Sequence, residues 1–420
     1  MSSQLTTPPK GFRDILPEQA RARDWLRSSL QRVYERHAYE PIETPTLERA
    51  ETLMGKYGEE ADTLLYRFLD NGGRAVGLRY DQTVPTARFM AANAGTLAMP
   101  FRRYQMQPVF RAEKPQKGRY REFLQSDADI FGAIEGAADA ETLAVFWHCY
   151  AELGFTPSTL TLILNHRSSL RKLVADAKIS DSQSSKVLQI LDKLDKKSAQ
   201  EVQEELQSSL KLEQETIARL FTLLEHAQMP QELQEIVQIA IKLGVPKEAI
   251  QFSPTLVRGL DYYTGMIFES KLSSGGSSLG GGGRYDNLIQ QLGGPAIPAV
   301  GFGIGFDRTL EAAVERQLVP TTTLGSRVLV TVFDATLLLT SAEVVTTLRA
   351  SDIAAQLYPV PNKDLSKQLR YADASGMTVA VVIGPDEKQA NQVTLKYLET
   401  GIQKTIALDQ LTTELATLSR

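Results

Sequence analysis

The residues best suited to chemistry lie in separate stretches that combine arginines, glycines and paired polar side chains. Residues 110–123 read Phe-Arg-Ala-Glu-Lys-Pro-Gln-Lys-Gly-Arg-Tyr-Arg-Glu-Phe, so a strand-like segment ends in Arg111 and Glu113 and a basic loop follows. An arginine fork pairs with phosphate oxygens through two parallel hydrogen bonds, so this loop could hold phosphate groups. A solvated β-hairpin is the ordinary alternative for a charged loop of this kind.

A second stretch, residues 258–265, reads Arg-Gly-Leu-Asp-Tyr-Tyr-Thr-Gly. Adjacent tyrosines on a strand point to opposite faces, so of Tyr262 and Tyr263 one could pack while the other presents its hydroxyl to a pocket. The alternative is a tyrosine-rich strand in which Arg258 makes an edge ion pair.

Two glycine-rich stretches follow, four consecutive glycines at 280–283 and Gly-Phe-Gly-Ile-Gly-Phe-Asp-Arg at 301–308. Glycine allows backbone to approach a ligand or another strand closely. The Gly-Lys-Ser/Thr ending of a P-loop is absent, and the spacing of the dinucleotide-binding fingerprint is not met. Neither stretch therefore predicts one of these nucleotide-binding motifs.

Other catalytic chemistries find no support in the sequence. The four histidines are scattered without metal-ligand spacing, so we expect structural roles for them and no protein-bound metal. No Ser-His-Asp or Cys-His arrangement can be identified. The single cysteine, Cys149, rules out an intramolecular disulfide and is typical of a reducing compartment such as the cytoplasm.

The elements that must position these residues fit a chain of two to three domains. The 420 residues are 42% hydrophobic and 23% charged, as in globular proteins. The apolar runs are too short to span a bilayer and the N-terminus carries no targeting pattern, so we expect no membrane partner. A net charge of −4 argues against a generic nucleic-acid coat protein.

The texture of the sequence changes along the chain. A helix is predicted over residues 17–36, and short β-prone pieces between glycine and charged clusters predict an antiparallel sheet over 64–131 and 252–310. Between them, residues 168–250 contain one glycine and have helical spacing, which predicts an inserted helical module. After a linker near 319–325, alternating strands and helices predict a small, mostly parallel α/β domain over 326–420.

Taken together, these stretches resemble the three signature motifs of class II aminoacyl-tRNA synthetases: the helix leading to Pro45, residues 110–123, and residues 301–308. Residues 256–265 and 281–286 resemble the two histidine-specific motifs of the histidyl-tRNA synthetase family. Further similarity lies in residues 9–14, 78–83, 191–196 and 367–373. The resemblance thus covers nearly the whole chain in the family's order.

The resemblance implies an α+β catalytic core of the class II synthetase type, built on an antiparallel sheet over residues 1–325. It also implies a helical insertion at 168–250 and a C-terminal α/β anticodon-binding domain at 326–420. The implied reaction is ATP-dependent ligation of L-histidine to tRNA(His) through histidyl-adenylate, in a cytoplasmic homodimer, with Mg²⁺ bound to the ATP.

The implied site residues follow the same resemblance. Arg258 and Arg111 would be catalytic, contacting the α-phosphate and the substrate carboxylate. ATP would also be bound by Glu113 at the adenine amino group and by Arg308 at the γ-phosphate. The histidine-binding residues would be Asp81, Thr83, Gln125, Asp129, Tyr262 and Tyr263. Some family members carry Glu in place of Asp81 and of Asp129, which shortens each carboxylate here by one methylene.

Two alternatives belong to the same superfamily. One is a catalytically silent paralogue that acts as the regulatory subunit of ATP phosphoribosyltransferase, which would be expected to lack the C-terminal domain and some ATP-binding arginines. The other is a class II synthetase for glycine, proline or threonine, against which residues 258–265 argue. The acidic net charge excludes only non-specific nucleic-acid binding. Because salt screens charges beyond ~8 Å, binding of a tRNA end would depend on the local positive charge of residues 114–121.

Overall fold

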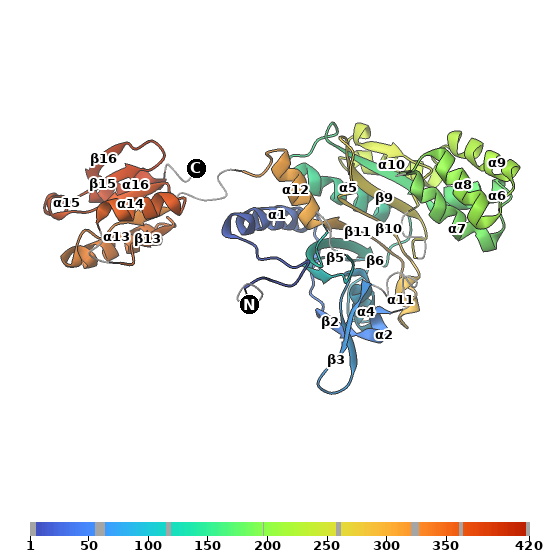
Figure 1. The fold of residues 1–420 in the computed structure, drawn as a ribbon, viewed down its shortest axis with the longest axis horizontal. Helices are drawn as coiled ribbons and strands as arrows, with labels where there is room; N and C mark the ends of the chain where they lie inside the picture. Colours follow the sequence, from blue (N-terminus) through green and yellow to red (C-terminus); the bar gives the residue numbers. More distant parts are fainter. Residues whose placement is uncertain are drawn as a thin grey trace. The chain divides into compact units, whose positions relative to one another are not determined.

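The computed structural model describes residues 6–54, 64–114, 119–195, 197–257, 262–320, 327–360 and 364–416. The chain divides into two compact units, residues 1–319 and 320–420, and each has its own sheet and apolar core. The first unit contains an eight-stranded sheet and a three-stranded sheet, and the second contains a five-stranded sheet (Figure 1).

The large sheet forms the centre of the first unit. Its strands are mostly antiparallel, as the sequence predicts, and only the outermost pairs β1–β5 and β7–β8 are parallel. In order across the sheet they are β1 (Glu40–Pro41), β5 (Phe101–Phe110), β6 (Glu122–Phe131), β11 (Ala299–Gly305), β10 (Gly280–Arg284), β9 (Met266–Leu272), β7 (Leu160–His166) and β8 (Ile250–Phe252).

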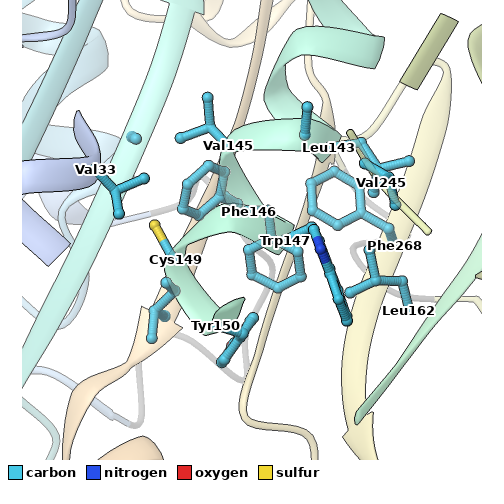
Figure 2. Packing of buried hydrophobic residues seen from close by; sticks show 14 of the residues in the cluster. Val33, Leu143, Val145, Phe146, Trp147, Cys149, Tyr150, Leu162, Val245 and Phe268 are labelled. Carbon is cyan, nitrogen blue, oxygen red and sulfur yellow. The ribbon is translucent and has the colours of Figure 1, made fainter. Parts of the chain in front are cut away.

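Helix α5 (Ala137–Glu152) packs on one face of this sheet and carries the main core. Its Phe146 ring lies 5.0 Å from the rings of both Phe268 and Phe302. Figure 2 shows Phe146 and Trp147 among apolar side chains from β7 and β9. Helices α1 (Pro17–Arg36), α10 (Gln231–Lys242) and α12 (Phe306–Glu315) contribute to the same core.

Helix α1 begins and ends where the sequence predicts. Pro17 occupies the first turn, where its missing N–H costs no hydrogen bond. Leu26, Leu30 and Val33 recur at helical spacing and are buried, so burial of one apolar stripe accounts for the packing of this helix.

A smaller sheet extends from the first unit beside two helices. It is antiparallel, and its members lie in the order β2 (Leu47–Arg49), β4 (Ala75–Leu78) and β3 (Tyr66–Leu69). Helix α2 (Ala50–Leu53) lies against it, and α4 (Thr83–Asn93) contacts α2, α11 (Leu288–Gln291) and, through an ion pair of Arg88, Glu48 of β2. The Thr86 hydroxyl of α4 also donates to the Gln105 side chain of β5, so the start of α4 lies close to the large sheet.

A helical module follows β7 and has an apolar core of its own. It comprises α6 (Arg167–Asp176), α7 (Asp181–Leu191), η1 (Asp192–Asp195), α8 (Ala199–Leu210) and α9 (Gln214–Glu225), which gather at one end of the first unit (Figure 1). Helix α10 also lies within the predicted insertion 168–250 but packs against α5. The reason is that Leu233, Ile236 and Ala240 of α10 are buried in the core of the large sheet.

The second unit is an α/β domain with a mixed sheet. Strand β12 (Val328–Val330) pairs in parallel with β13 (Ala355–Leu357) and β14 (Val379–Val382), whereas β15 (Gln392–Tyr397) and β16 (Gln403–Ala407) are antiparallel. Its helices are α13 (Leu338–Ala350), α14 (Leu365–Ala374), α15 (Pro385–Ala390) and α16 (Leu411–Ala416). In neither unit do the described residues include a helix of the length and apolarity needed to cross a membrane.

Candidate active site

A cavity of about 450 Å³ lies on the face of the large sheet opposite α5. Strand β6 shows how the two faces differ, because successive side chains alternate. Leu124, Ala128 and Ile130 are buried in the core, whereas Gln125, Asp127 and Asp129 line the cavity. The wall of the cavity formed by β6 is therefore polar and acidic.

Glycines on the neighbouring strand make room for these carboxylates. In the register of β11 against β6, Gly301 lies opposite Asp129 and Gly303 opposite Asp127. A Cβ atom at position 301 would overlap Oδ1 of Asp129, and one at 303 would lie 2.7 Å from Oδ1 of Asp127. The sheet thus accommodates two carboxylates by keeping β11 without side chains on this face.

Asp129 is held between two partners. Its Oδ2 forms an ion pair with the fully buried Arg103 of β5, and its Oδ1 accepts a hydrogen bond from the Tyr285 hydroxyl. Burial raises the pKa of Asp129, and the charge of Arg103 opposes this rise. Arg103 on β5 and Tyr285, which directly follows β10, fix both oxygens, so the carboxylate presents a defined orientation to the cavity.

Asp127 is the second buried carboxylate of the wall. Its two oxygens accept hydrogen bonds from Nε2 of Gln125, each at 2.9 Å. Burial raises the pKa of Asp127 to about 7, with Arg103 acting against the shift and Asp129 adding to it. The side chain therefore titrates near neutral pH.

We expect Asp127→Asn to weaken the pH dependence of stability. In the unfolded chain the carboxyl has its ordinary pKa of ~3.9, so between about pH 4 and pH 7 only the folded protein holds this proton. The bound proton adds most to the free energy of unfolding at low pH, and this addition is lost as the pH rises through 7. The free energy of unfolding therefore declines by roughly 3 kcal/mol from pH 5 to pH 8. Urea unfolding at pH 5 and pH 8 should show a decline smaller by this amount in Asp127→Asn. The exposed-site control Asp409→Asn should follow the wild type, and equal declines in all three proteins would contradict the shift.

The start of α4 brings another carboxylate to the cavity. The buried Gln82 donates from Nε2 to the backbone carbonyls of Gln107 and Gln125, at 2.9 and 2.8 Å. Its neighbours Asp81 and Thr83 line the cavity, and Oδ1 of Asp81 accepts the Val84 N–H at 3.3 Å. The side chain of Gln82 thus fixes this helix start to β5 and β6.

Three tyrosines close the acidic end. The Tyr262 and Tyr263 ring centroids are 4.2 Å apart, and Tyr262 lies edge-on to Tyr285 at 6.3 Å. All three line the cavity. Aromatic rings beside fixed carboxylates suit a planar, hydrogen-bonding ligand group.

Cationic side chains line the rest of the cavity. Nε of Arg111 donates to the Tyr80 carbonyl at 3.1 Å, and the Arg111 guanidinium lies 5.0 Å from the Phe123 ring centroid. Arg308, in the first turn of α12, donates from Nη1 to the Ser278 carbonyl at 3.3 Å. Nη1 of Arg119 lies 3.9 Å from Oε2 of Glu113. This end of the cavity can bind an anionic ligand such as a polyphosphate.

The N-terminal segment is fastened beside this cationic end. Arg13 and Arg23 both form ion pairs with Asp307, whose other oxygen accepts the Leu124 N–H at 3.3 Å. The Arg13 guanidinium also lies 3.6 Å from the centroid of the Tyr120 ring. Asp307 therefore joins α1, β6 and α12 at the rim.

The structure brings the sequence-predicted site residues together, with one exception. Arg258 lies outside the described residues. The others all line the one cavity: Asp81, Thr83, Arg111, Glu113, Gln125, Asp129, Tyr262, Tyr263 and Arg308. Their individual roles remain predictions.

Sequence reasoning missed several residues of this site. Asp127 follows Gln125 and precedes Asp129 at intervals of two, so strand alternation alone would have placed it on the same face. Tyr285 lies within the stretch 281–286, whose pattern predicts no role for it. Arg103 and Asp307 act through partners far away in sequence, and no local signal marks them.

Comparison with known proteins agrees with this geometry. The family model described as "Histidyl-tRNA synthetase" matches residues 11–309, and the model described as "Anticodon binding domain" matches residues 327–418. The chain belongs to the histidyl-tRNA synthetase family.

Relatives of this family match over nearly their whole length. A histidine–tRNA ligase of Rhodopirellula baltica is 36% identical, with 95% of this chain and 94% of the relative covered. A histidine–tRNA ligase of Cytophaga hutchinsonii is 35% identical, with 96% of this chain and 98% of the relative covered. The crystal structure of histidyl-tRNA synthetase from Nostoc sp. PCC 7120 has a TM-score of 0.85 at 27% identity, covering 98% of this chain and 99% of that one. The class II synthetase fold predicted from the sequence is thereby confirmed.

Proposed function

We propose that this protein ligates L-histidine to tRNA(His) at the expense of ATP, through a histidyl-adenylate. The observation that carries the proposal is one cavity with an acidic, tyrosine-lined end and a cationic end. In the first step a histidine carboxylate oxygen attacks the α-phosphorus of ATP and pyrophosphate leaves. In the second, a ribose hydroxyl of the tRNA's terminal adenosine attacks the acyl carbon and AMP leaves.

The acidic end is suited to histidine. Asp81 and Thr83, helped by Gln125, bind the α-amino group, since an ammonium needs acceptors and a negative charge. Asp129, Tyr262 and Tyr263 bind the imidazole, whose two nitrogens require one acceptor and one donor. A buried site built for such bonds discriminates strongly against side chains that lack them.

The cationic end is suited to ATP. Arg111 contacts the α-phosphate and the substrate carboxylate, Arg308 the γ-phosphate, and Glu113 the adenine amino group. Arg258 is assigned to the α-phosphate by family resemblance alone. Two anionic reactants must be brought together, and fixed cations do this without a nucleophilic side chain.

Mg²⁺ fits this site as a companion of ATP. Among the described residues no group of three or more acidic, histidine or cysteine side chains forms a ready-made metal site. Mg²⁺ usually keeps several waters and binds through substrate phosphates with one or two carboxylates, so such a cage is not required. Bound in this way, the ion would neutralise the β- and γ-phosphates, while Arg111 and Arg308 orient the nucleotide.

Amino-acid-dependent ATP–pyrophosphate exchange tests the proposal. The full-length protein should exchange with histidine and not with other standard amino acids, and should charge tRNA(His). No exchange with histidine, or equal exchange with glycine, proline or threonine, would contradict it.

The regulatory-subunit alternative is not favoured. A Bacillus halodurans structure titled as an ATP phosphoribosyltransferase regulatory subunit/histidyl-tRNA synthetase is similar at TM-score 0.74, but at 24% identity this likeness shows the fold alone. Here the anticodon binding domain match over residues 327–418 and the positions of Arg111 and Arg308 in the cavity support the synthetase.

The C-terminal unit is proposed to bind the tRNA anticodon. It has a separate core, so a protein ending at Val319 should keep its first unit folded. We expect exchange to remain near the full-length rate and tRNA charging to fall at least about tenfold, because a second attachment point raises effective affinity by such factors or more. Unchanged charging would remove the tRNA-binding role from this unit.

A cytoplasmic homodimer completes the proposal. Leu47, Phe68 and Leu69 are exposed on the small sheet, and a second copy would cover this apolar surface. The buried free thiol of Cys149 is consistent with a reducing compartment. Sedimentation at a concentration near that in cells should give twice the chain mass.

A further inference from the structure

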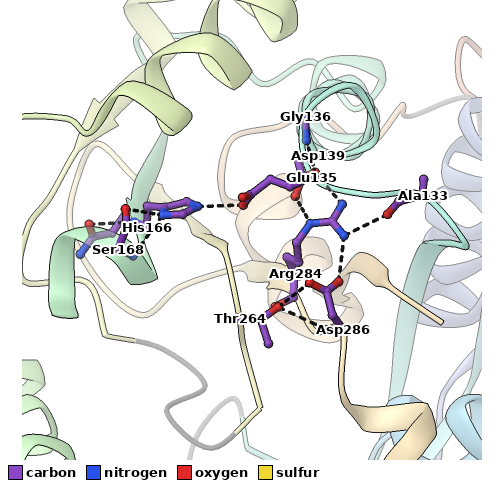
Figure 3. Close-up of polar contacts among 10 residues, drawn as sticks. Ala133, Glu135, Gly136, Asp139, His166, Ser168, Thr264, Arg284 and Asp286 are labelled. Atoms are coloured by element: carbon purple, nitrogen blue, oxygen red, sulfur yellow. Dashed lines mark hydrogen bonds and ion pairs between the residues drawn. The ribbon is translucent and has the colours of Figure 1, made fainter. Parts of the chain in front are cut away.

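A polar network centred on the buried pair Arg284 and Asp139 lies beside Thr264, the residue that follows the cavity tyrosines in the chain (Figure 3). We define the anchor network by its six side chains, none of which is among the described residues that line the cavity: Glu135, Asp139, His166, Thr264, Arg284 and Asp286. The network connects the ends of β10 and β7 to the segment that follows Tyr263.

Arg284 is the centre of the anchor network and is 1% exposed. Its Nε and Nη2 donate to the two oxygens of Asp139, at 2.9 and 2.6 Å. Its Nη1 donates to Asp286 Oδ1 at 2.8 Å and to the Ala133 carbonyl at 3.0 Å. Since Asp139 also caps the first turn of α5 through the Gly136 N–H, the guanidinium is fixed to the main core helix.

Thr264 attaches to this centre through both backbone and side chain. Its N–H donates to the Arg284 carbonyl at 2.7 Å, and its hydroxyl donates to Asp286 Oδ2 at 3.0 Å. The Asp286 N–H donates back to the same hydroxyl at 3.3 Å. Hydrogen bonds from both backbone and side chain thus hold the residue that directly follows Tyr263.

A second attachment holds the next residue of the same segment, Gly265. Nε2 of His166 lies 2.8 Å from Oε1 of Glu135, and Nδ1 of His166 is fixed by the Ser168 hydroxyl at 2.7 Å. The Glu135 carboxylate lies where a Cβ atom of residue 265 would be, so a larger residue there would displace Glu135 from His166. The Gly265 carbonyl accepts the Arg167 N–H at 3.0 Å.

From these contacts we propose that the anchor network positions Tyr262 and Tyr263, and so sets the affinity for the amino acid without touching it. Its members are positioning residues. The backbone at 264 and 265 is held by hydrogen bonds to Arg284 and Arg167, which fixes where Tyr263 enters the cavity. Tyr263 has little freedom to compensate, because its ring lies against Gly283, where a Cβ atom would be 3.0 Å from Cδ1. The inference rests on the proposed function and names further residues that determine histidine binding.

Thr264→Val tests this inference, because it keeps the shape of the side chain and removes the hydroxyl bonded to Asp286. We expect the KM for histidine in ATP–pyrophosphate exchange to rise at least about tenfold, because the change removes both hydrogen bonds between the hydroxyl and Asp286. The KM for ATP should stay within about twofold, and Thr264→Ser should restore the KM for histidine, since it returns the hydroxyl. The matched control is Thr142→Val, which removes a buried hydroxyl bonded to the Ala138 carbonyl in α5.

Glu135→Ala provides a second, independent test, since it removes the acceptor that His166 contacts while the side chain is partly exposed. It should also raise the KM for histidine selectively. A normal KM for histidine in both variants, an equal rise for ATP, or the same rise in Thr142→Val would overturn the inference. These results are distinct from failure of the proposed function, in which the wild type itself would show no histidine-dependent exchange.

Discussion

Arg111→Ala is expected to reduce histidine-dependent ATP–pyrophosphate exchange by about 10²–10³-fold, because preorganised groups that stabilise developing charge have effects of this size. Arg111 lies at the end of β5, where its contacts with the Tyr80 carbonyl and the Phe123 ring fix the guanidinium at the cavity. Arg111 and Arg308 supply the positive charge at the cationic end of the cavity. Steady-state exchange at saturating histidine and ATP measures the effect.

Two further variants make this result specific. Arg111→Lys keeps the charge but not the fork, so it should recover only part of the activity. Arg74→Ala removes an arginine exposed in the turn between β3 and β4 and should behave as the wild type. An Arg111→Ala protein with normal exchange, or one with lost secondary structure in circular dichroism, would contradict a catalytic role.

Gly301→Ala is expected to destabilise the first unit by about 3 kcal/mol or more and to abolish exchange. The added methyl would overlap Asp129 and lie 2.7 Å from the Ala128 carbonyl, which is backbone and cannot move aside. Asp129 is itself held by Arg103 and Tyr285, so it cannot turn away without breaking a buried ion pair. Overpacking alone costs ~1–3 kcal/mol, and disturbance of the ion pair adds to it.

Urea unfolding followed by fluorescence measures the loss of stability. Gly95→Ala is the matched control, since a Cβ atom at this position meets nothing within 4 Å, and it should leave stability and exchange unchanged. A Gly301→Ala protein as stable as this control would show that β11 and β6 adjust to a side chain at this position.

Much of the architecture could be predicted from the sequence because local physics determines it. Pro17 and the apolar spacing of Leu26, Leu30 and Val33 determine α1, and β-prone segments between turns account for β5 and β6. The extent of the helical module was harder to predict, because α10 has the same periodicity as its neighbours. Only the tertiary contact of Leu233 and Ile236 with the core of α5 distinguishes it.

Site residues within recognisable motifs could be predicted from the sequence. Residues that reach the site from distant parts of the chain could not. Arg111 and Arg308 lie in recognisable stretches, whereas the role of Asp129 follows from the family resemblance. Arg103 reaches Asp129 through strand pairing, and Arg13 reaches Asp307 across 294 positions. Such partners depend on the register and on the closing of the fold, which no single stretch encodes. The raised pKa of Asp127 likewise arises from burial between strands.

Tyr263 has a consequence that reaches beyond the cavity. It lines the cavity and also packs against the apolar core shared by Leu256, Val257 and the helices α6–α9. The side chain therefore belongs to two equilibria, ligand binding and the internal order of the helical module. By thermodynamic reciprocity, a ligand that fixes Tyr263 stabilises the module by the same free energy with which an ordered module tightens the binding of that ligand.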